Sequence, residues 1–225
     1  MSKYSKGYFA TLKGKTVTFV VVSSFGDIKV QFVNSFADYK IEITNTPILI
    51  FYDIINLEEI IMSKSIVIYF SRADENYSVG YIEKGNTEVI AEYIRDFTGA
   101  DMFKVERKIP YAKDYNTCIR ESQDEQRKNA RPELVKELAN IDEYDTVYIG
   151  APIYWGTMPN PMFTQLEKLN WQDKVVKPFT THEGSGLGNV VSDLKKLCKG
   201  AIVKDGLAIY GHNVYNSKDK VKNWL

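Results

Sequence analysis

The sequence predicts an α/β fold in which a doubly wound, five-stranded parallel sheet follows a small β-rich N-terminal extension. Two observations predict this fold. After Met62 the chain repeats a strand, a loop and a helix, and several of the strands are nearly continuous apolar runs, as in strands that helices cover on both faces. Before Met62 only strand-like segments recur. A chain of 225 residues is long enough for one good core and a smaller appendage, so we expect two parts, residues 1–61 and 62–225.

The N-terminal part has β-branched and aromatic segments that partly alternate and are separated by polar turns. They predict strands at residues 15–23, 28–33, 39–44 and 48–53, and residues 54–61 could form a short helix. About sixty such residues would make a marginal domain on their own. We therefore expect this part to pack on the rest of the chain or on a partner chain, and the sequence assigns it no role.

The C-terminal part has strand-like runs at residues 65–70, 101–106, 146–151, 174–180 and 206–211. The segments between them carry apolar residues at helical spacing. One stripe consists of Val89, Ile90, Tyr93, Ile94 and Phe97, and a second consists of Val190, Val191, Leu194 and Leu197. Gly99 is a typical helix end for the first stripe. Five strands that alternate with helices predict a parallel sheet wound on both faces.

The composition limits the partners and the compartment. The net charge is zero, so no basic field would attract nucleic acid or a membrane surface. The two cysteines form no CxxC motif, which indicates reduced thiols in a cytoplasmic protein. With only two histidines, a histidine-based metal site is not expected. The N-terminus lacks the apolar core of a signal peptide, and the apolar run from Pro47 is too short and too acidic to span a membrane.

In an open parallel sheet, ligands bind beyond the carboxyl ends of the strands, and three loops there are unusual. In the first, Ser71 and Arg72 follow the first strand, and Asn86 and Thr87 precede the first helix. Asn or Thr is a natural N-cap, and the free N–H groups of a helix start attract phosphate. These residues predict a phosphate site; the alternative is a capped helix after a long polar loop.

The second loop, APIYWGTMPNP, follows the third strand and places Tyr154 and Trp155 side by side. Pro152 stiffens this loop, and Gly156 lets the backbone turn or approach a ligand. A core would normally bury one such aromatic residue. Two in succession suggest that at least one stacks on a flat ligand; the alternative is a hydrophobic lid over the end of the sheet.

The third loop, THEGSGLG, follows the fourth strand and is rich in glycine. Its backbone amides are open for hydrogen bonds to a ligand edge, and His182 is the candidate for proton delivery. The alternative is a flexible loop before a helix. A phosphate site, an aromatic shelf and a glycine-rich rim at one end of one sheet fit a mononucleotide with a planar heterocycle.

Several separated motifs resemble those of the flavodoxin-like family, in particular its branch with a PIWWGTMP-type loop. They are IVIYFSR and GNTEVIAEYI, the polar stretch from YAKDYN to ARPEL, YDTVYIGAPIYWGTMPNP, and KPFTTHEGSGLGNVVSDLKKL. The resemblance covers residue 62 to about residue 225 and implies a sheet of order 2-1-3-4-5 that binds FMN non-covalently. It implies phosphate contacts from Ser71, Arg72, Asn86 and Thr87. Contacts to the isoalloxazine ring are implied for Pro152, Ile153, Tyr154, Trp155 and Gly156 on one side, and for Thr181, His182, Gly184 and Gly186 on the other.

Two departures from the family pattern affect the predicted function. About a dozen residues, 73–84, are inserted between the two halves of the phosphate turn, where they could cover the flavin or a substrate. The charge is balanced, whereas flavodoxins that carry electrons are usually acidic, which steers them to basic partners. We expect FMN-dependent electron transfer to a redox partner protein, with no covalent catalytic residue. The alternatives are an FMN-dependent NAD(P)H reductase of small acceptors such as quinones, and a non-redox binding module that has lost the cofactor.

Overall fold

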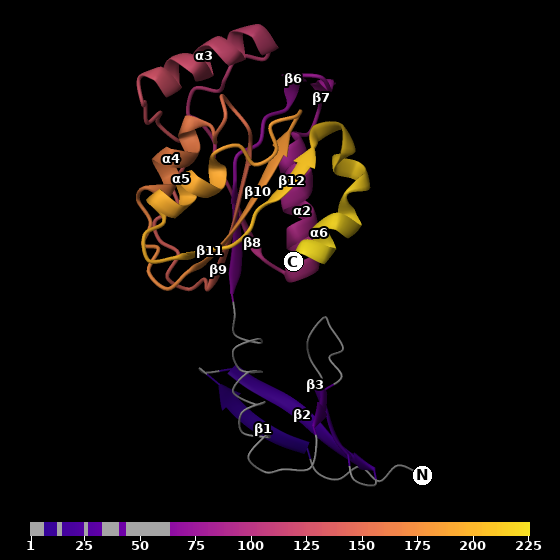
Figure 1. The fold of residues 1–225 in the computed structure, drawn as a ribbon. Helices are drawn as coiled ribbons and strands as arrows, with labels where there is room; N and C mark the ends of the chain where they lie inside the picture. Colours follow the sequence, from indigo (N-terminus) through magenta and orange to yellow (C-terminus); the bar gives the residue numbers. More distant parts are fainter. Residues whose placement is uncertain (1–6, 13–14, 25–26, 33–40, 44–63) are drawn as a thin grey trace. The chain divides into compact units, whose positions relative to one another are not determined.

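The computed structural model describes residues 7–12, 15–24, 27–32, 41–43 and 64–225. The chain divides into two units, Met1–Met62 and Ser63–Leu225, which Figure 1 shows in indigo and in purple to yellow. Within the described residues, no helix combines the length and the apolar character that a membrane span requires.

The first unit contains a four-stranded antiparallel sheet in the order β1-β2-β3-β4. Its strands are β1 (Gly7–Leu12), β2 (Lys15–Ser24), β3 (Asp27–Phe32) and β4 (Ile41–Ile43). The last three agree with the strands predicted from the sequence. The first was not predicted, because Gly7 and Ala10 have low strand propensity. The strand expected at residues 48–53 and the short helix at 54–61 lie outside the described residues.

The second unit is built on a parallel sheet. Its main strands are β5 (Ser65–Tyr69), β8 (Asp101–Lys104), β9 (Thr146–Pro152), β10 (Val175–His182) and β12 (Leu207–Tyr210). They lie in the order β8-β5-β9-β10-β12, which confirms the predicted order 2-1-3-4-5. The short strand β11 (Ile202–Val203) pairs with the start of β10, on the same edge as β12.

The helices of this unit are α2 (Asn86–Thr98), α3 (Tyr115–Arg127), α4 (Asn160–Leu166), α5 (Val190–Leu197), the 3₁₀ helix η1 (Gly211–Asn216) and α6 (Lys218–Trp224). Both apolar stripes predicted from the sequence form helices, α2 and α5. The first helix ends at Gly99, whose φ of 69° is left-handed and whose N–H donates to the carbonyl of Arg95.

Helices cover both faces of this sheet (Figure 1). Alternate residues of β5 belong to different cores, as the two-residue period of a strand requires. Ile66 and Ile68 pack in a core that includes residues of α4 and α5. Val67 and Tyr69 pack in a second core with residues of α2 and α6. The doubly wound architecture leaves the carboxyl ends of the strands as the open edge from which the three unusual loops emerge.

The insertion between β5 and α2 forms a β-hairpin of β6 (Asp74–Asn76) and β7 (Gly80–Ile82). Ser78 in its tip and Gly80 just after it have positive φ angles of 65° and 71°. A glycine adopts this left-handed backbone without the steric cost that a Cβ brings, which accounts for Gly80 at the end of the turn.

Candidate functional site

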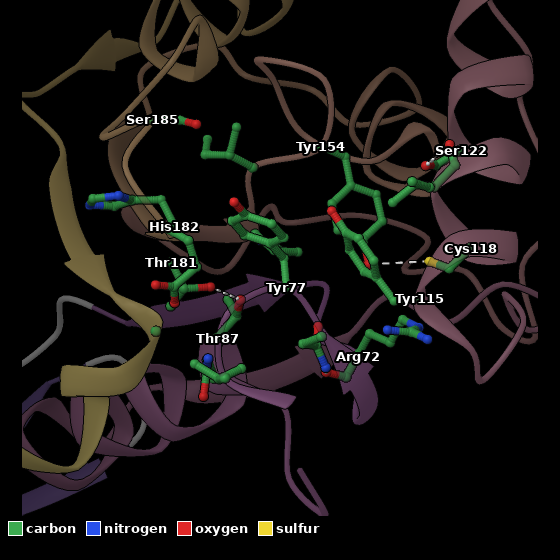
Figure 2. Close-up of a pocket in the computed structure, with 18 of the residues that line it drawn as sticks. Arg72, Tyr77, Thr87, Tyr115, Cys118, Ser122, Tyr154, Thr181, His182 and Ser185 are labelled. Carbon is green, nitrogen blue, oxygen red and sulfur yellow. Dashed lines mark hydrogen bonds between the residues drawn. The ribbon is translucent and has the colours of Figure 1, made fainter. Parts of the chain in front are cut away.

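A cavity of about 270 Å³ opens at the carboxyl ends of β5, β9 and β10. It is bordered by all three predicted loops and also by the β6–β7 hairpin and helix α3 (Figure 2). The residues predicted from the sequence that line it are Ser71, Arg72, Asn86, Thr87, Pro152, Ile153, Tyr154, Trp155, Thr181 and His182. Three predicted glycines, Gly156, Gly184 and Gly186, do not line it.

The start of α2 is shaped by a close approach of two segments. The N-cap is Gly85, and Asn86 and Thr87 are the first two residues of the helix, so the expectation of an Asn or Thr cap was wrong. A Cβ at Gly85 would lie 2.1 Å from the Oγ of Ser71 and 2.7 Å from the carbonyl oxygen of Arg72. Only glycine therefore fits between the loop after β5 and the start of α2. Ser71 takes over part of the capping, because its Oγ accepts a hydrogen bond of 3.0 Å from the N–H of Glu88.

Several hydrogen-bond donors at this helix start are left for a ligand. In the described part of the chain, nothing accepts from the backbone N–H groups of Asn86 and Thr87. Such N–H groups at a helix start favour an anion. The hydroxyls of Thr87 and Thr181 lie 2.7 Å apart in a buried position, so one donates to the other and the second O–H remains available. Ser71 accepts through its oxygen, which leaves its own O–H to donate.

Arg72 lines the cavity, but most of its guanidinium is already engaged. Its NH2 group donates to the carbonyls of Ala112 and Lys113, at 2.7 and 2.6 Å, and its NH1 group donates to the carbonyl of Glu75. Its Nε is buried and has no hydrogen-bond partner among the described residues. Arg72 thus joins the hairpin to the segment before α3. The sequence predicted that its guanidinium contacts a phosphate, but in the structure most of this group is bonded to backbone carbonyls.

The aromatic loop makes a tight turn that sets the position of Trp155. Tyr154 and Thr157 exchange backbone hydrogen bonds of 2.8 and 3.1 Å. Between them Trp155 and Gly156 have φ angles of 50° and 85°, as in a type I′ turn. The left-handed backbone costs a residue with a Cβ roughly 1–2 kcal/mol. This cost is offset by two bonds to α3, one from the Trp155 Nε1 to the Oγ of Ser122 and one from the Gln126 side chain to the Trp155 carbonyl, each of 3.1 Å.

The two aromatic residues of this loop have different surroundings. Trp155 is 44% exposed at the rim of the cavity. The ring of Tyr154 packs edge-on against Phe70 and Tyr111, with centroids 6.2 and 6.0 Å apart. Its hydroxyl lies 3.8 Å from the Sγ of Cys118. Burial raises the pKa of Tyr154 well above its ordinary value and also raises the pKa of Cys118, so this wall is uncharged at neutral pH.

The glycine-rich loop packs against the aromatic loop. A Cβ at Gly188 would lie 2.4 Å from the carbonyl oxygen of Gly156, which accepts a bond of 2.7 Å from the N–H of Asn189. The carbonyl of Gly186 accepts from the Thr180 hydroxyl at 2.9 Å. The carbonyls of Gly156 and Gly186 therefore take part in the bonds that hold these two loops in place. These bonds account for the position of the two glycines outside the cavity lining.

His182 lines the cavity as a neutral imidazole. Burial lowers its pKa, the nearby Lys220 lowers it further, and Glu183 opposes the shift. Its Nδ1 accepts a hydrogen bond of 3.0 Å from the N–H of Gly184. In the neutral ring the proton is therefore on Nε2, which is free to donate to a ligand. Gly184 donates this bond with a φ of 124°, a backbone conformation that residues with a Cβ rarely adopt. This requirement explains why glycine occupies the position.

Sequence reasoning missed about half of the cavity lining. The missed residues are Asn76, Tyr77 and Val79 from the hairpin, Tyr115, Cys118, Ile119 and Ser122 from α3, and Glu183, Ser185 and Gly211. One signal could have found the α3 residues. This helix follows β8, whose carboxyl end lies at the same edge of the sheet. No local signal indicates where the inserted hairpin lies.

The sequence model of a family described as flavodoxin matches residues 75–225. Among solved structures, a candidate flavoprotein from Bacteroides uniformis is 26% identical, with a TM-score of 0.59, and the match covers 72% of this chain and 97% of that one. A candidate flavoprotein from Bacteroides eggerthii is 29% identical, with a TM-score of 0.55 and coverages of 71% and 98%. A flavoprotein from Lactobacillus acidophilus in complex with FMN is 23% identical, with a TM-score of 0.48 and coverages of 71% and 99%. No curated protein matches the sequence.

Proposed function

This chain belongs to the flavodoxin family, and we propose that its cavity binds FMN and that the protein transfers electrons to a redox partner protein. One observation carries the proposal: anion-binding donors and an aromatic wall meet in a single cavity at the carboxyl ends of the strands. When bound, FMN supplies the redox chemistry by accepting and releasing one or two electrons. The residues of the chain bind it, orient it and exclude water.

The phosphate end of FMN fits the start of α2. The open N–H groups of Asn86 and Thr87, the hydroxyl of Ser71 and the Thr87–Thr181 hydroxyl pair provide donors without a full positive charge. A phosphate needs several donors and a favourable dipole, and the start of a 13-residue helix provides both. Because Arg72 is held by backbone carbonyls, we assign the phosphate contacts mainly to these neutral donors.

The isoalloxazine ring fits the remaining part of the cavity, between the aromatic loop and the loop after β10. Ile153, Tyr154 and Trp155 line one side and His182 lines another. The cavity volume of about 270 Å³ is close to the lower end of the range of about 300–1,000 Å³ that is typical of ligand clefts. The neutral imidazole of His182 carries a proton on Nε2 at this edge, which makes it the candidate for proton delivery to the cofactor.

A second function is NAD(P)H-dependent reduction of a small acceptor such as a quinone, and the balanced net charge of the chain favours it. The sequence has a formal net charge of zero, so no acidic field steers a basic protein partner to the cavity. A small neutral acceptor needs no such field.

One experiment separates the two functions, under anaerobic conditions with the FMN-loaded protein. For a carrier, we expect NADH or NADPH with a quinone to react no faster than with an equal amount of free FMN. After reduction by dithionite, we expect the protein to pass electrons to a one-electron acceptor such as a c-type cytochrome. If the protein oxidises NAD(P)H in the presence of a quinone much faster than free FMN does, the protein is a reductase and the carrier function is contradicted.

A further inference from the structure

The β6–β7 hairpin brings an aromatic residue into the cavity that the phosphate turn alone would not supply. Tyr77, in the loop between β6 and β7, lines the cavity together with Val79. In Figure 2 Tyr77 lies between the side formed by Thr181 and His182 and the side formed by Tyr154. Its side chain is 61% exposed. Tyr81, four residues further along the same hairpin, is 70% exposed and does not line the cavity.

The base of the hairpin is fixed to the segment that precedes α3. Glu75 makes two direct contacts there: its N–H donates to the carbonyl of Lys113 at 3.3 Å, and its Oε2 accepts from the N–H of Tyr115, the first residue of α3, at 2.8 Å. Its carbonyl also accepts from Arg72, which itself donates to the carbonyls of Ala112 and Lys113. Within the hairpin, the side-chain amide of Asn76 donates to the carbonyl of Asp74 at 3.1 Å. These contacts hold the loop that carries Tyr77 over the cavity.

Tyr77 also has an aromatic neighbour there. Its ring centroid lies 5.7 Å from that of Tyr115, with the two planes tilted by 35°. The two rings come from different segments and form one aromatic wall, whereas the Ile153–Trp155 loop forms another. A flat heterocycle has two faces. When one face stays in water, the complex lacks the favourable free energy of burying the apolar surface of that face.

We propose that Tyr77 is a flavin-contacting residue whose ring covers the face of the isoalloxazine that the aromatic loop leaves open. This inference rests on the proposed binding of FMN. The apolar surface that Tyr77 exposes is then buried against the cofactor, and the hairpin closes the mouth of the cavity. The inserted segment thus slows the release of FMN and shields its ring from solvent.

The test compares Tyr77→Ala with Tyr77→Phe and with the matched control Tyr81→Ala on the same hairpin. The readouts are the FMN dissociation rate and the quenching of bound flavin fluorescence by iodide. For Tyr77→Ala we expect release about 5- to 150-fold faster and a flavin more accessible to iodide, as the loss of one stacked ring predicts. For Tyr77→Phe and Tyr81→Ala we expect rates within about twofold of the original protein.

Three outcomes would overturn the inference. Release from Tyr77→Ala at the original rate would show that the ring does not contact the cofactor. An equal acceleration in Tyr81→Ala would show that the whole hairpin, and not Tyr77, slows release. If the unaltered protein does not bind FMN, the proposed function is contradicted together with this inference. The first two outcomes contradict the inference alone. If Tyr77→Ala lowers the melting temperature, Tyr77→Ser gives the same comparison with a polar side chain at this exposed position.

Discussion

Replacing Gly85 by alanine is expected to weaken FMN binding about 100-fold, or about 2.8 kcal/mol. The added Cβ would lie 2.1 Å from the Oγ of Ser71 and 2.7 Å from the carbonyl oxygen of Arg72. The loop after β5 must then move away from the start of α2, which breaks the bond from the Glu88 N–H to Ser71. Each hydrogen bond to a charged phosphate contributes about 1.5–3 kcal/mol, so misplacing one or two donors gives this loss.

Riboflavin, which lacks the phosphate, is the internal control for Gly85→Ala. Its affinity should fall much less than that of FMN, because most of the proposed ring contacts lie on the other two loops and only Tyr77 lies on the segment between β5 and α2. Ser71→Ala, which removes one donor without a clash, should weaken FMN binding by about tenfold. Isothermal titration with both flavins measures these changes. Equal losses for FMN and riboflavin would mean that the substitution disturbs the fold and not a phosphate turn, and unchanged FMN affinity would remove the phosphate assignment.

Replacing Trp155 by asparagine is expected to weaken the binding of both FMN and riboflavin by about 5- to 150-fold. This range corresponds to about 1–3 kcal/mol for the stacking of one aromatic ring on a heterocycle. Asparagine is the appropriate replacement because it tolerates the left-handed backbone that Trp155 adopts, with φ of 50°. The variant therefore keeps the turn and removes the ring. Flavin fluorescence should also rise in the complex, since an indole at contact quenches it.

Ser122→Ala is the matched control for Trp155. It removes the acceptor of the 3.1 Å bond from the indole Nε1 but leaves the ring in place, so its effect on either flavin should be smaller than that of Trp155→Asn. Unchanged affinity for FMN and riboflavin in Trp155→Asn would show that Trp155 does not stack on the ring. The isoalloxazine would then be left to Tyr154 on this side of the cavity.

The fold of the second unit could be predicted from the sequence because its signals are local. An apolar strand such as β5 and the stripe from Val89 to Phe97 each identify an element within a few residues. The position of the ligand loops follows from a general rule for parallel sheets and needs no tertiary detail. In the same way, sequence alone placed Thr87, Trp155 and His182 at one cavity.

The remaining features depend on contacts between distant segments. Gly85 replaces Asn86 as the N-cap because Ser71 approaches it closely, and that distance is set by how β5 and α2 pack. Arg72 turns toward backbone carbonyls some forty residues away, and the same segment fixes the hairpin that carries Tyr77. Nothing in the local sequence of residues 73–84 encodes these contacts.

The most direct test of FMN binding in this cavity is a titration of the unaltered protein with FMN and with riboflavin, followed by flavin fluorescence. We predict saturation at one FMN per chain, with quenched fluorescence from the aromatic wall, and an affinity for riboflavin about 100-fold lower because the donors at the start of α2 have no phosphate to bind. Absence of saturable FMN binding would contradict the proposal and would favour the non-redox binding module.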